Sequence, residues 1–283
     1  GVAHSQLGQF NRAVPCFRRA IEMDSQIFQF HKNLELALMQ LGQYEDAALS
    51  LKTALEIRPE DHSVRHFLGA VSSHPSDKAS LNKYVEDLFD DYAETFDDHL
   101  VNVLNYRVPE LLRLAIGHEG DAEEAVWNVI DLGCGTGLCG LLFRDLADKL
   151  VGVDLSSAML DQARKRDVYD ELLQTDVTEA LAHATELYDL VIAADVMIYV
   201  GDLAPLFEAC ARALRSGGRF AFTIESTDRN SYFIDSSGRY RHSPEYIRNL
   251  ATDHHFQIDR SEEIAIRKEF GKAVEGHLFV LSK

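Results

Sequence analysis

Short apolar segments alternate with stretches of helical character through the second half of this 283-residue chain. Each segment ends at, or directly before, an acidic residue. The segments occupy residues 127–131, 150–154, 172–175, 190–194 and 220–225. Such an alternation predicts βαβ units, and therefore an α/β fold in which helices cover both faces of a parallel sheet.

The last part of the sequence departs from this alternation. Residues 264–268 and 277–282 both read as strands, and only a short break at Gly271 and Lys272 separates them. Strands joined this closely pair antiparallel, because a parallel connection needs a crossover of about a dozen residues or more. We therefore expect an antiparallel pair at one edge of the sheet.

A period of 34 residues marks the N-terminal part. Gly-Gln-Phe at 8–10 recurs as Gly-Gln-Tyr at 42–44, and the same shift relates Ala13 to Ala47. This period and these residue types resemble the tetratricopeptide repeat, a pair of helices joined by a turn. A helical hairpin that only resembles the repeat is the alternative.

The residues of the repeat fit this interpretation. Gly42 permits a tight turn, and Ala47 and Ala54 are small enough for paired helices to approach closely. Tyr44 and Leu51 are expected to fill the groove between the helices. Only one repeat, at about 28–61, is complete, so we expect the chain to be cut from a longer array, which the missing initiator Met also suggests.

Domain boundaries follow from these patterns. Residues 1–73 are predicted to be an all-α repeat segment, and residues 72–80 have the composition of a linker. Residues 81–283 are predicted to form the second domain, with residues 81–115 as helices at its start. One face of these helices is acidic, and we expect a solvated face there rather than a docking site for cations. Its members are Glu86, Asp87, Asp90, Asp91, Glu94, Asp97 and Asp98.

A glycine-rich segment follows the first predicted strand. Residues 129–137 read Val-Ile-Asp-Leu-Gly-Cys-Gly-Thr-Gly. Glycines at the start of a helix let backbone N–H groups approach a ligand closely. Asp131 lies on the buried strand itself, where a carboxylate is costly without a partner. A cationic group on a ligand would be one such partner.

Two interpretations of this segment compete. Residues 135–140 match the Gly-x-Gly-x-x-Gly dinucleotide fingerprint, and Asp154 follows at the spacing of a ribose-binding acid. The segment that begins at Asp131 instead resembles the first motif of class I S-adenosylmethionine-dependent methyltransferases. The residues of that motif are Asp131, Gly133, Gly135 and Gly137.

Residues after the next strands extend the resemblance. A carboxylate at Asp154 can accept hydrogen bonds from two ribose hydroxyls. The resemblance implies that Leu155 borders the cofactor and that Met159 packs on the adenine. It also implies that Asp176 meets the adenine amino group and that the backbone N–H of Val177 meets a ring nitrogen.

Asp195 would then face the methionine half of the cofactor. Acids after four successive strands fit a ligand at the carboxyl edge of a parallel sheet; the alternative is that each caps a helix or lies in a loop. The resemblance implies a Rossmann-like, seven-stranded sheet with the last strand antiparallel. Together with the repeats, it is similar to a group of bacterial repeat-containing methyltransferases.

Helices before the glycine segment fold over the cofactor in related enzymes. Tyr92, Tyr106 and Arg107 are therefore candidates for a lid. An aromatic ring near the sulfonium would add cation–π attraction, and Arg107 would pair with the cofactor carboxylate. For Tyr92, packing in the core is the alternative.

Methyl transfer from a sulfonium needs in-line alignment and, for some acceptors, a base. Candidate catalytic residues are Asp195, Tyr199 and His242, with Glu225 as a further candidate base. His242 follows two arginines and a tyrosine that would grip an anionic or hydroxylated substrate. A surface loop before a helix capped by Ser243, at about 244–252, is the alternative.

Composition excludes several classes of function. The formal net charge of −18 disfavours nucleic acid as a partner. No run of about 18 apolar residues is present, so no membrane span is predicted. The four cysteines form no Cys-x-x-Cys pair, which favours reduced thiols in the cytoplasm. We expect no metal site, because Asp195, Glu225 and Asp228 do not reproduce the cluster of acids and an amide that metal-assisted methyltransferases need near the substrate.

The sequence thus predicts a cytoplasmic S-adenosylmethionine-dependent methyltransferase with N-terminal repeats. The expected acceptor is an O, N or C nucleophile on a small-molecule, carrier-bound or peptide substrate, and the repeats are expected to bind a protein partner. A nucleotide-binding oxidoreductase is one alternative. The other is a non-catalytic scaffold whose core binds the cofactor.

Overall fold

The computed structural model describes residues 1–72, 78–117, 127–235, 237–269 and 272–283. The chain divides into two compact units. Residues 1–84 and 234–239 form the repeat unit, and residues 85–233 and 240–283 form the sheet unit. Residues 234–239 thus belong to the repeat unit in this division, although the sequence analysis included them in the second domain.

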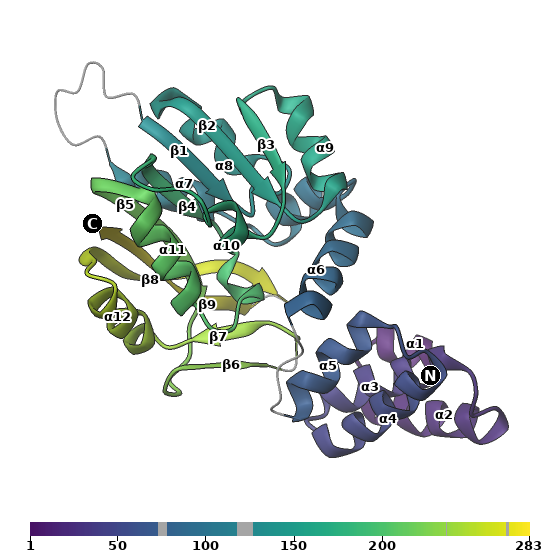
Figure 1. The fold of residues 1–283 in the computed structure, drawn as a ribbon. Helices are drawn as coiled ribbons and strands as arrows, with labels where there is room; N and C mark the ends of the chain where they lie inside the picture. The colour runs from purple at the N-terminus through teal and green to yellow at the C-terminus, as the bar shows by residue number, and fades with distance from the viewer. Residues whose placement is uncertain (73–77, 118–126, 236, 270–271) are drawn as a thin grey trace. The chain divides into compact units, whose positions relative to one another are not determined.

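Antiparallel helices build the repeat unit (Figure 1). They are α1 (Val2–Gln6), α2 (Phe10–Met23), α3 (Phe28–Gln40), α4 (Tyr44–Ile57) and α5 (His62–Ser72). Gly8 and Gly42 turn the chain between paired helices with φ of 69° and 70°, a region that favours glycine. The helix–turn–helix arrangement predicted from the period is therefore present.

Small buried residues bring the repeat helices together. Ala47, Leu51 and Ala54 of α4 have no exposed surface, as the period predicts. The prediction for Tyr44 is wrong, because its side chain is 47% exposed. Tyr44 is the first residue of α4, and from that position its ring points to solvent rather than into the groove.

A seven-stranded sheet forms the centre of the sheet unit, in the order β3-β2-β1-β4-β5-β9-β8. Strands β1 to β5 pair in parallel, and β9 lies antiparallel between β5 and β8. The strands are β1 (Trp127–Leu132), β2 (Ala147–Asp154), β3 (Glu171–Gln174), β4 (Tyr188–Ala193), β5 (Leu214–Glu225), β8 (Gln257–Glu269) and β9 (Lys272–Ser282). The predicted fold class is confirmed, including the antiparallel strand.

Helices cover both faces of this sheet, so its inner strands are buried on both sides. Successive residues of β1 point to opposite faces: Ile130 joins a core with α11 (Ala204–Ala213) and α12 (Pro244–Asp253), and Val129 joins a second core. The second core includes α7 (Val108–Ile116) and α8 (Leu138–Phe143). Helix α9 (Ser157–Arg166) follows β2.

The strand order fixes where a ligand would bind. From β1 the chain moves to β2 and β3 on one side, and it returns to β4 on the other side of β1. Ligands of open α/β sheets lie outside the carboxyl ends of the strands at such a reversal. In this chain that place is the carboxyl edge of β1 and β4.

Two predicted segments differ from the structure. Residues 81–115 do not form continuous helix: α6 (Lys78–Tyr92) is followed by a π-helical turn at Asp98–Val103 and then by α7. Asn105 has a φ of 52°, which no helix accommodates, and Pro109 stands at the start of α7.

The segment expected as a loop before Ser243 contains a small hairpin, β6 (Tyr232–Ile234) with β7 (Tyr240–His242). The helix predicted after it is α12, and the side chain of Ser243 caps it by accepting the N–H of Tyr246. Gly271 of the predicted break lies outside the described residues, and Lys272 begins β9. Among the helices described, none is both long and apolar enough to cross a bilayer.

Candidate functional site

The glycine segment forms a loop between β1 and α8. Gly133, Gly135 and Gly137 have φ of 67°, 54° and 94°, which L side chains rarely adopt. A Cβ at Gly133 would also lie 2.4 Å from Cγ2 of Val196. The backbone path of this loop therefore requires glycine, and it brings the chain close to the carboxyl edge of the sheet.

Tyr169 packs beneath this loop, and sequence analysis missed it. A Cβ at Gly140 would lie 2.5 Å from Cζ of Tyr169, and one at Gly152 would lie 3.0 Å from its Cδ1. The third glycine of the apparent dinucleotide fingerprint thus makes room for a tyrosine ring. Tyr169 lies between α9 and β3, and no motif in the sequence marks it.

Asp131 is buried on β1 with only part of its hydrogen-bonding capacity used. Its side chain is 1% exposed, and Oδ2 accepts a 2.7 Å hydrogen bond from the Tyr169 hydroxyl. Oδ1 has no hydrogen-bond partner among the described residues. Burial raises the pKa of Asp131 to about 7, although the hydrogen bond from Tyr169 has the smaller, opposite effect of lowering this pKa. A cationic ligand group would stabilise the ionised form.

Asp154, at the end of β2, lies against the glycine loop. Its Oδ2 accepts the N–H of Gly135 at 2.9 Å, and its Oδ1 accepts the N–H of Ser156 at 2.9 Å. Burial raises the pKa of Asp154, although these backbone hydrogen bonds lower it. Each carboxylate oxygen keeps a further lone pair, so Asp154 can still accept hydrogen bonds from a ligand.

The predicted adenine contacts lie on the elements that follow. Met159 is buried in α9, and Leu155 is half-buried directly after Asp154. Asp176 accepts the N–H groups of Thr178 and Glu179, at 2.9 and 3.3 Å, and so caps the short helix that begins at Val177. The structure thus shows the helix cap that was the alternative for Asp176. Contacts of Leu155, Met159, Asp176 and Val177 with adenine stay a prediction.

Asp195 lies two residues after the end of β4, and its backbone is in a strained conformation. It has a φ of 58°, and its N–H donates to Oγ1 of Thr223 at 3.0 Å. Oδ2 accepts a 2.9 Å hydrogen bond from Nη1 of Arg267, whereas Oδ1 has no partner within the described chain. Asp131 and Asp195 thus each keep one free carboxylate oxygen, at the ends of neighbouring strands.

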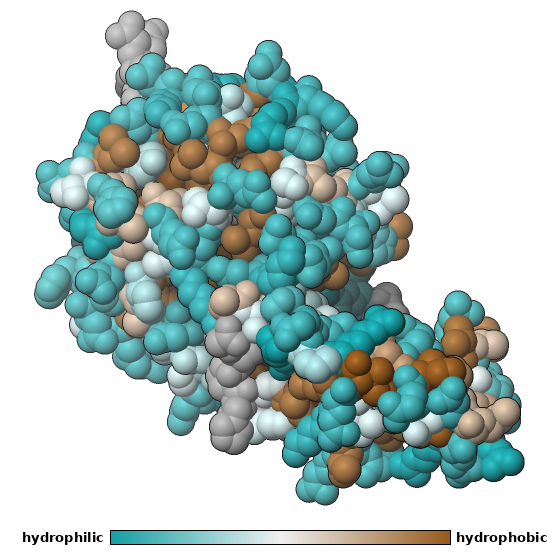
Figure 2. All heavy atoms as spheres, turned by 45° about the vertical axis from the view of Figure 1, so that its right-hand side comes forward, coloured by the Kyte–Doolittle hydropathy of each residue, from teal (hydrophilic) through white to brown (hydrophobic). Residues whose placement is uncertain are grey.

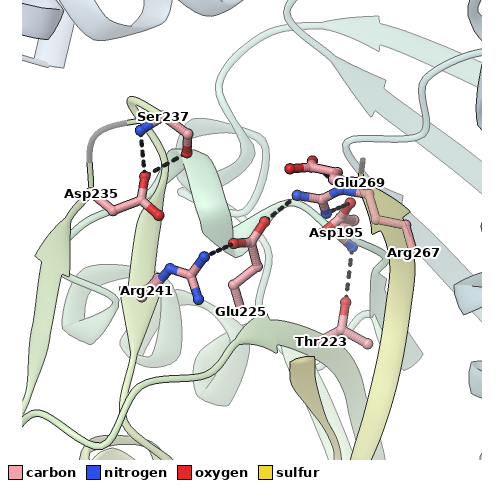
Figure 3. A network of polar contacts seen from close by, with 8 residues as sticks. All are labelled: Asp195, Thr223, Glu225, Asp235, Ser237, Arg241, Arg267 and Glu269. Atoms are coloured by element: carbon pink, nitrogen blue, oxygen red, sulfur yellow. Dashed lines mark hydrogen bonds and ion pairs between the residues drawn. The ribbon is translucent and has the colours of Figure 1, made fainter. Parts of the chain in front are cut away.

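An ionic network surrounds Asp195 (Figure 3). Arg267 of β8 is 4% exposed, and it also binds Glu225 and Glu269. Glu225 in turn lies 3.4 Å from Arg241. Arg267 was not predicted from the sequence, although an arginine directly after Ala265 and Ile266 in a strand is a weak signal of a buried charge.

The predicted lid residues have different environments. The Tyr92 hydroxyl is hydrogen-bonded to Nδ1 of His99, and its ring packs edge-on against Phe96. Tyr106 is buried, and burial with a smaller effect of the Asp195 charge holds its pKa well above the usual range. Arg107 is exposed directly before α7. Of the three lid candidates, Tyr106 has a hydroxyl that is affected by the charge of Asp195, and its lid role stays a prediction.

Two members of the acidic run bind the loops that follow β1 and β2, so the expectation of a solvated face is wrong for them. Asp97 accepts a 2.5 Å hydrogen bond from Oγ1 of Thr136 and pairs with Arg166. Asp90 accepts a 2.6 Å hydrogen bond from Oγ of Ser156. Through Asp90, the C-terminal part of α6 is fastened to the start of α9. Through Asp97, the residues after α6 are fastened to the glycine loop.

The remaining catalytic candidates are His242 of β7 and Tyr199. His242 is fully buried, and its Nε2 is hydrogen-bonded to the carbonyl oxygen of Gly201 at 2.9 Å. Burial lowers the pKa of His242 to about 4, so the imidazole is neutral at pH 7. Tyr199 is half-buried, and its ring contacts Phe89 at a centroid distance of 5.4 Å. Catalytic roles for both stay predictions.

The sheet order, the antiparallel β9, the glycine loop and the acids at the strand ends together define the fold of class I methyltransferases. Within that class, residues 130–222 match the family model described as a methyltransferase domain. Residues 1–27 and 36–61 match the tetratricopeptide repeat. The chain thus carries a methyltransferase domain preceded by tetratricopeptide repeats, and the resemblance seen in the sequence is confirmed.

Relatives by sequence each match part of the chain. The malonyl-[acyl-carrier protein] O-methyltransferase of Salmonella typhimurium is 35% identical over 96 residues, which cover 34% of this chain and 38% of that protein. The mitochondrial ubiquinone biosynthesis O-methyltransferase of Mus musculus is 26% identical over 157 residues, which cover 52% of this chain and 42% of that protein. The chain spans less than half the length of these two relatives.

Solved structures share the fold. A SAM-dependent methyltransferase from Leishmania major aligns with a TM-score of 0.58 at 16% identity, over 73% of this chain and 85% of that one. The [4+2]-cyclase SpnF aligns with a TM-score of 0.50 at 15% identity, over 62% of this chain and 81% of that one. Because one of these names is a cyclase, the fold alone does not establish the reaction.

Proposed function

We propose that the protein is an S-adenosylmethionine-dependent methyltransferase. The observation that carries the proposal is the pair of carboxylate oxygens, Oδ1 of Asp131 and Oδ1 of Asp195, that lack partners among the described residues. Leaving a buried carboxylate oxygen without a hydrogen bond is costly. An ammonium group at the carboxyl edge of β1 and β4 would offset that cost, and the amino-acid end of the cofactor supplies one.

The rest of the site fits the same cofactor. Asp154, whose Oδ2 already accepts the N–H of Gly135, would accept the ribose hydroxyls. Met159 is buried in the helix that follows and would pack against the adenine. When bound, the cofactor supplies a methyl group already activated by a positively charged sulfur.

The chain's own part in the reaction is therefore binding and alignment. Direct transfer requires the acceptor atom, the methyl carbon and the sulfur to lie in line, and orientation of this kind contributes a large share of catalysis. Asp131, Asp154 and Asp195 would fix the donor from three strand ends. The segment fastened by Asp90 and Asp97 would exclude water from one side of it.

We propose an oxygen nucleophile on a small-molecule or carrier-bound acceptor, because the two relatives are named as O-methyltransferases of such compounds. A carboxylate acceptor would need no base, whereas a hydroxyl acceptor would need one. Tyr199 and His242 are proposed as candidates for this base. The neutral imidazole of His242 would accept the proton at Nδ1, which has no hydrogen-bond partner among the described residues.

The repeats are proposed to bind a protein partner. Apolar side chains interrupt the hydrophilic surface of the repeat unit (Figure 2). Among the described residues of this unit, the large apolar side chains that are most exposed are Leu7, Met23 and Leu49. We also propose that the protein acts in the cytoplasm, which the four unpaired cysteine thiols support.

Calorimetric titration tests the function directly. S-adenosylmethionine and S-adenosylhomocysteine are expected to bind in the micromolar range, about −8 kcal/mol, and NAD is not. Asp154→Ala should abolish binding. Asp148→Ala is the matched control, because Asp148 is exposed near the other end of the same strand. Binding of NAD alone would indicate the oxidoreductase; cofactor binding with no turnover on any acceptor would indicate the scaffold.

A further inference from the structure

We propose that Arg267 is a positioning residue of the methyl-donor site, which orients the Asp195 carboxylate so that its free oxygen faces the amino-acid end of the cofactor. The proposal rests on the proposed function, since it assigns a task to a residue beside that site. Arg267 does not belong to the glycine loop or to the acids at the parallel strand ends.

The origin of Arg267 makes its contacts informative. It comes from β8, the edge strand, which β9 and β5 separate from β4. Its guanidinium nevertheless reaches Asp195 after β4 and Glu225 at the end of β5. The antiparallel edge thus delivers a cation to the carboxyl ends of the parallel strands (Figure 3).

The geometry of the guanidinium matches a positioning task. Nη1 donates to Asp195, Nη2 to Glu225, and Nε to Glu269 at 2.8 Å, so three carboxylates are bound in one plane. With Oδ2 held at 2.9 Å, the Asp195 carboxylate cannot rotate without losing this hydrogen bond. Its Oδ1 is therefore fixed in direction before any ligand arrives.

Charge gives a second reason for an arginine at this place. Asp195, Glu225 and Glu269 would repel one another inside the protein, and Glu225 has almost no exposed surface. Lysine is a point charge without the planar fork, so it cannot bind three carboxylates in fixed directions.

The same strand segment also holds the lid. The N–H of Lys268 donates a 2.7 Å hydrogen bond to the carbonyl oxygen of Leu104, two residues before the buried Tyr106. The tip of β8 therefore contacts both the acid and the segment that carries the tyrosine near it. A change at Arg267 should consequently affect the amino-acid end of the cofactor rather than its adenosine end.

Two ligands separate these ends. S-adenosylhomocysteine carries the amino-acid group, and 5′-methylthioadenosine lacks it. Wild-type protein is expected to bind both. Arg267→Lys should weaken S-adenosylhomocysteine about tenfold, as expected for a misdirected hydrogen bond to a charged group, and leave 5′-methylthioadenosine unchanged. A general disturbance of the fold would weaken both ligands equally.

Arg215→Lys is the matched control. Arg215 also pairs with an aspartate of β4, with Nη1 at 2.8 Å from Oδ2 of Asp189, but it does so at the opposite end of the strand. Its substitution should change neither affinity. The charge-balanced variant Arg267→Met with Glu225→Gln repeats the test if Arg267→Lys fails to fold.

Each outcome bears on the proposal. Unchanged affinity of Arg267→Lys for S-adenosylhomocysteine, or equal loss of both ligands, overturns it. Unfolding of both Arg267 variants would assign the residue to stability and overturn it as well. If wild-type protein binds neither ligand, the proposed function itself is wrong, and the inference fails with it; a selective loss supports both.

Discussion

The hydroxyl of Tyr169 donates a hydrogen bond to Oδ2 of Asp131 and accepts one from the N–H of Gly140 at 3.2 Å. One side chain outside the glycine loop thus joins the first acid of the site to the helix that follows the loop. Without Tyr169, both oxygens of Asp131 would lack a partner among the described residues.

Tyr169→Phe should therefore lower the free energy of unfolding by about 1–3 kcal/mol, the cost of leaving a buried acceptor unsatisfied. Chemical denaturation without cofactor measures this change. Tyr44→Phe is the control, because the Tyr44 ring is exposed and removal of its hydroxyl should leave the free energy of unfolding unchanged. Equal stability of the two variants would show that the Tyr169 hydroxyl contributes nothing.

Gly140→Ala should destabilise the protein, because its Cβ would lie 2.5 Å from Cζ of Tyr169. Overpacking of this kind typically costs about 1–3 kcal/mol. Combined with Tyr169→Leu, the substitution should cost less than the two single effects together, since the ring that obstructs the Cβ is gone. Additive losses in a double-mutant cycle would mean that the glycine is required for another reason.

The pKa of Asp131 predicts a pH dependence of stability. This pKa is about 7 in the folded protein, above the ordinary value of 3.8, so the folded state binds the proton more tightly. The stability that this carboxyl contributes is complete below about pH 4 and is lost as the pH rises to 7. Asp131→Asn should remove that decline, which denaturation between pH 4 and 8 would measure; an identical pH profile in both proteins would contradict it.

Cofactor binding should depend on pH in the opposite direction. The amino group of S-adenosylhomocysteine needs the ionised form of Asp131, which is only about a tenth of the population at pH 6. The dissociation constant should therefore be up to about tenfold larger at pH 6 than at pH 7.5. Titration calorimetry in buffers of different ionisation heat would also detect protons released on binding. Affinity independent of pH would place the ammonium elsewhere.

Asp97→Asn should release the segment after α6 from the glycine loop, because the ion pair with Arg166 is lost and the hydrogen bond from Thr136 is weakened. Amide hydrogen exchange at residues 98–103 should become faster, and cofactor affinity should fall. The neighbouring Asp98 is exposed, so Asp98→Asn is the control. Unchanged exchange in Asp97→Asn would show that other contacts hold the segment.

The features that could be predicted from the sequence depend on residues that lie close together along the chain. The glycine loop, the acid that follows each strand and the Ser243 cap each depend on residues a few positions apart, and a period of 2 or 3.6 shows where strands and helices lie. Tyr169 and Arg267 could not be predicted in this way. Their partners Asp131 and Asp195 are 38 and 72 residues away in sequence, and only the packing of the sheet brings them together.

Composition likewise did not reveal the contacts of the acidic run before the glycine segment. Asp90 and Asp97 share the composition of a solvated helix face with their neighbours, and composition does not reveal that the chain breaks after Tyr92. Beyond the end of this helix, Asp97 binds Thr136 and Arg166. The error at Tyr44 also came from a terminal position, where the helical period no longer dictates which way a side chain points.

The place of Arg267 in the chain has a consequence for synthesis on the ribosome. Domains form as the chain emerges, N-terminal elements first, and β8 and β9 leave the exit tunnel after all five parallel strands. Asp195 and Glu225 are therefore made before the cation that binds them. Until β8 emerges, Asp195 lacks the arginine that binds it, and the ionic network around this acid is completed only when β8 and β9 join the sheet beside β5.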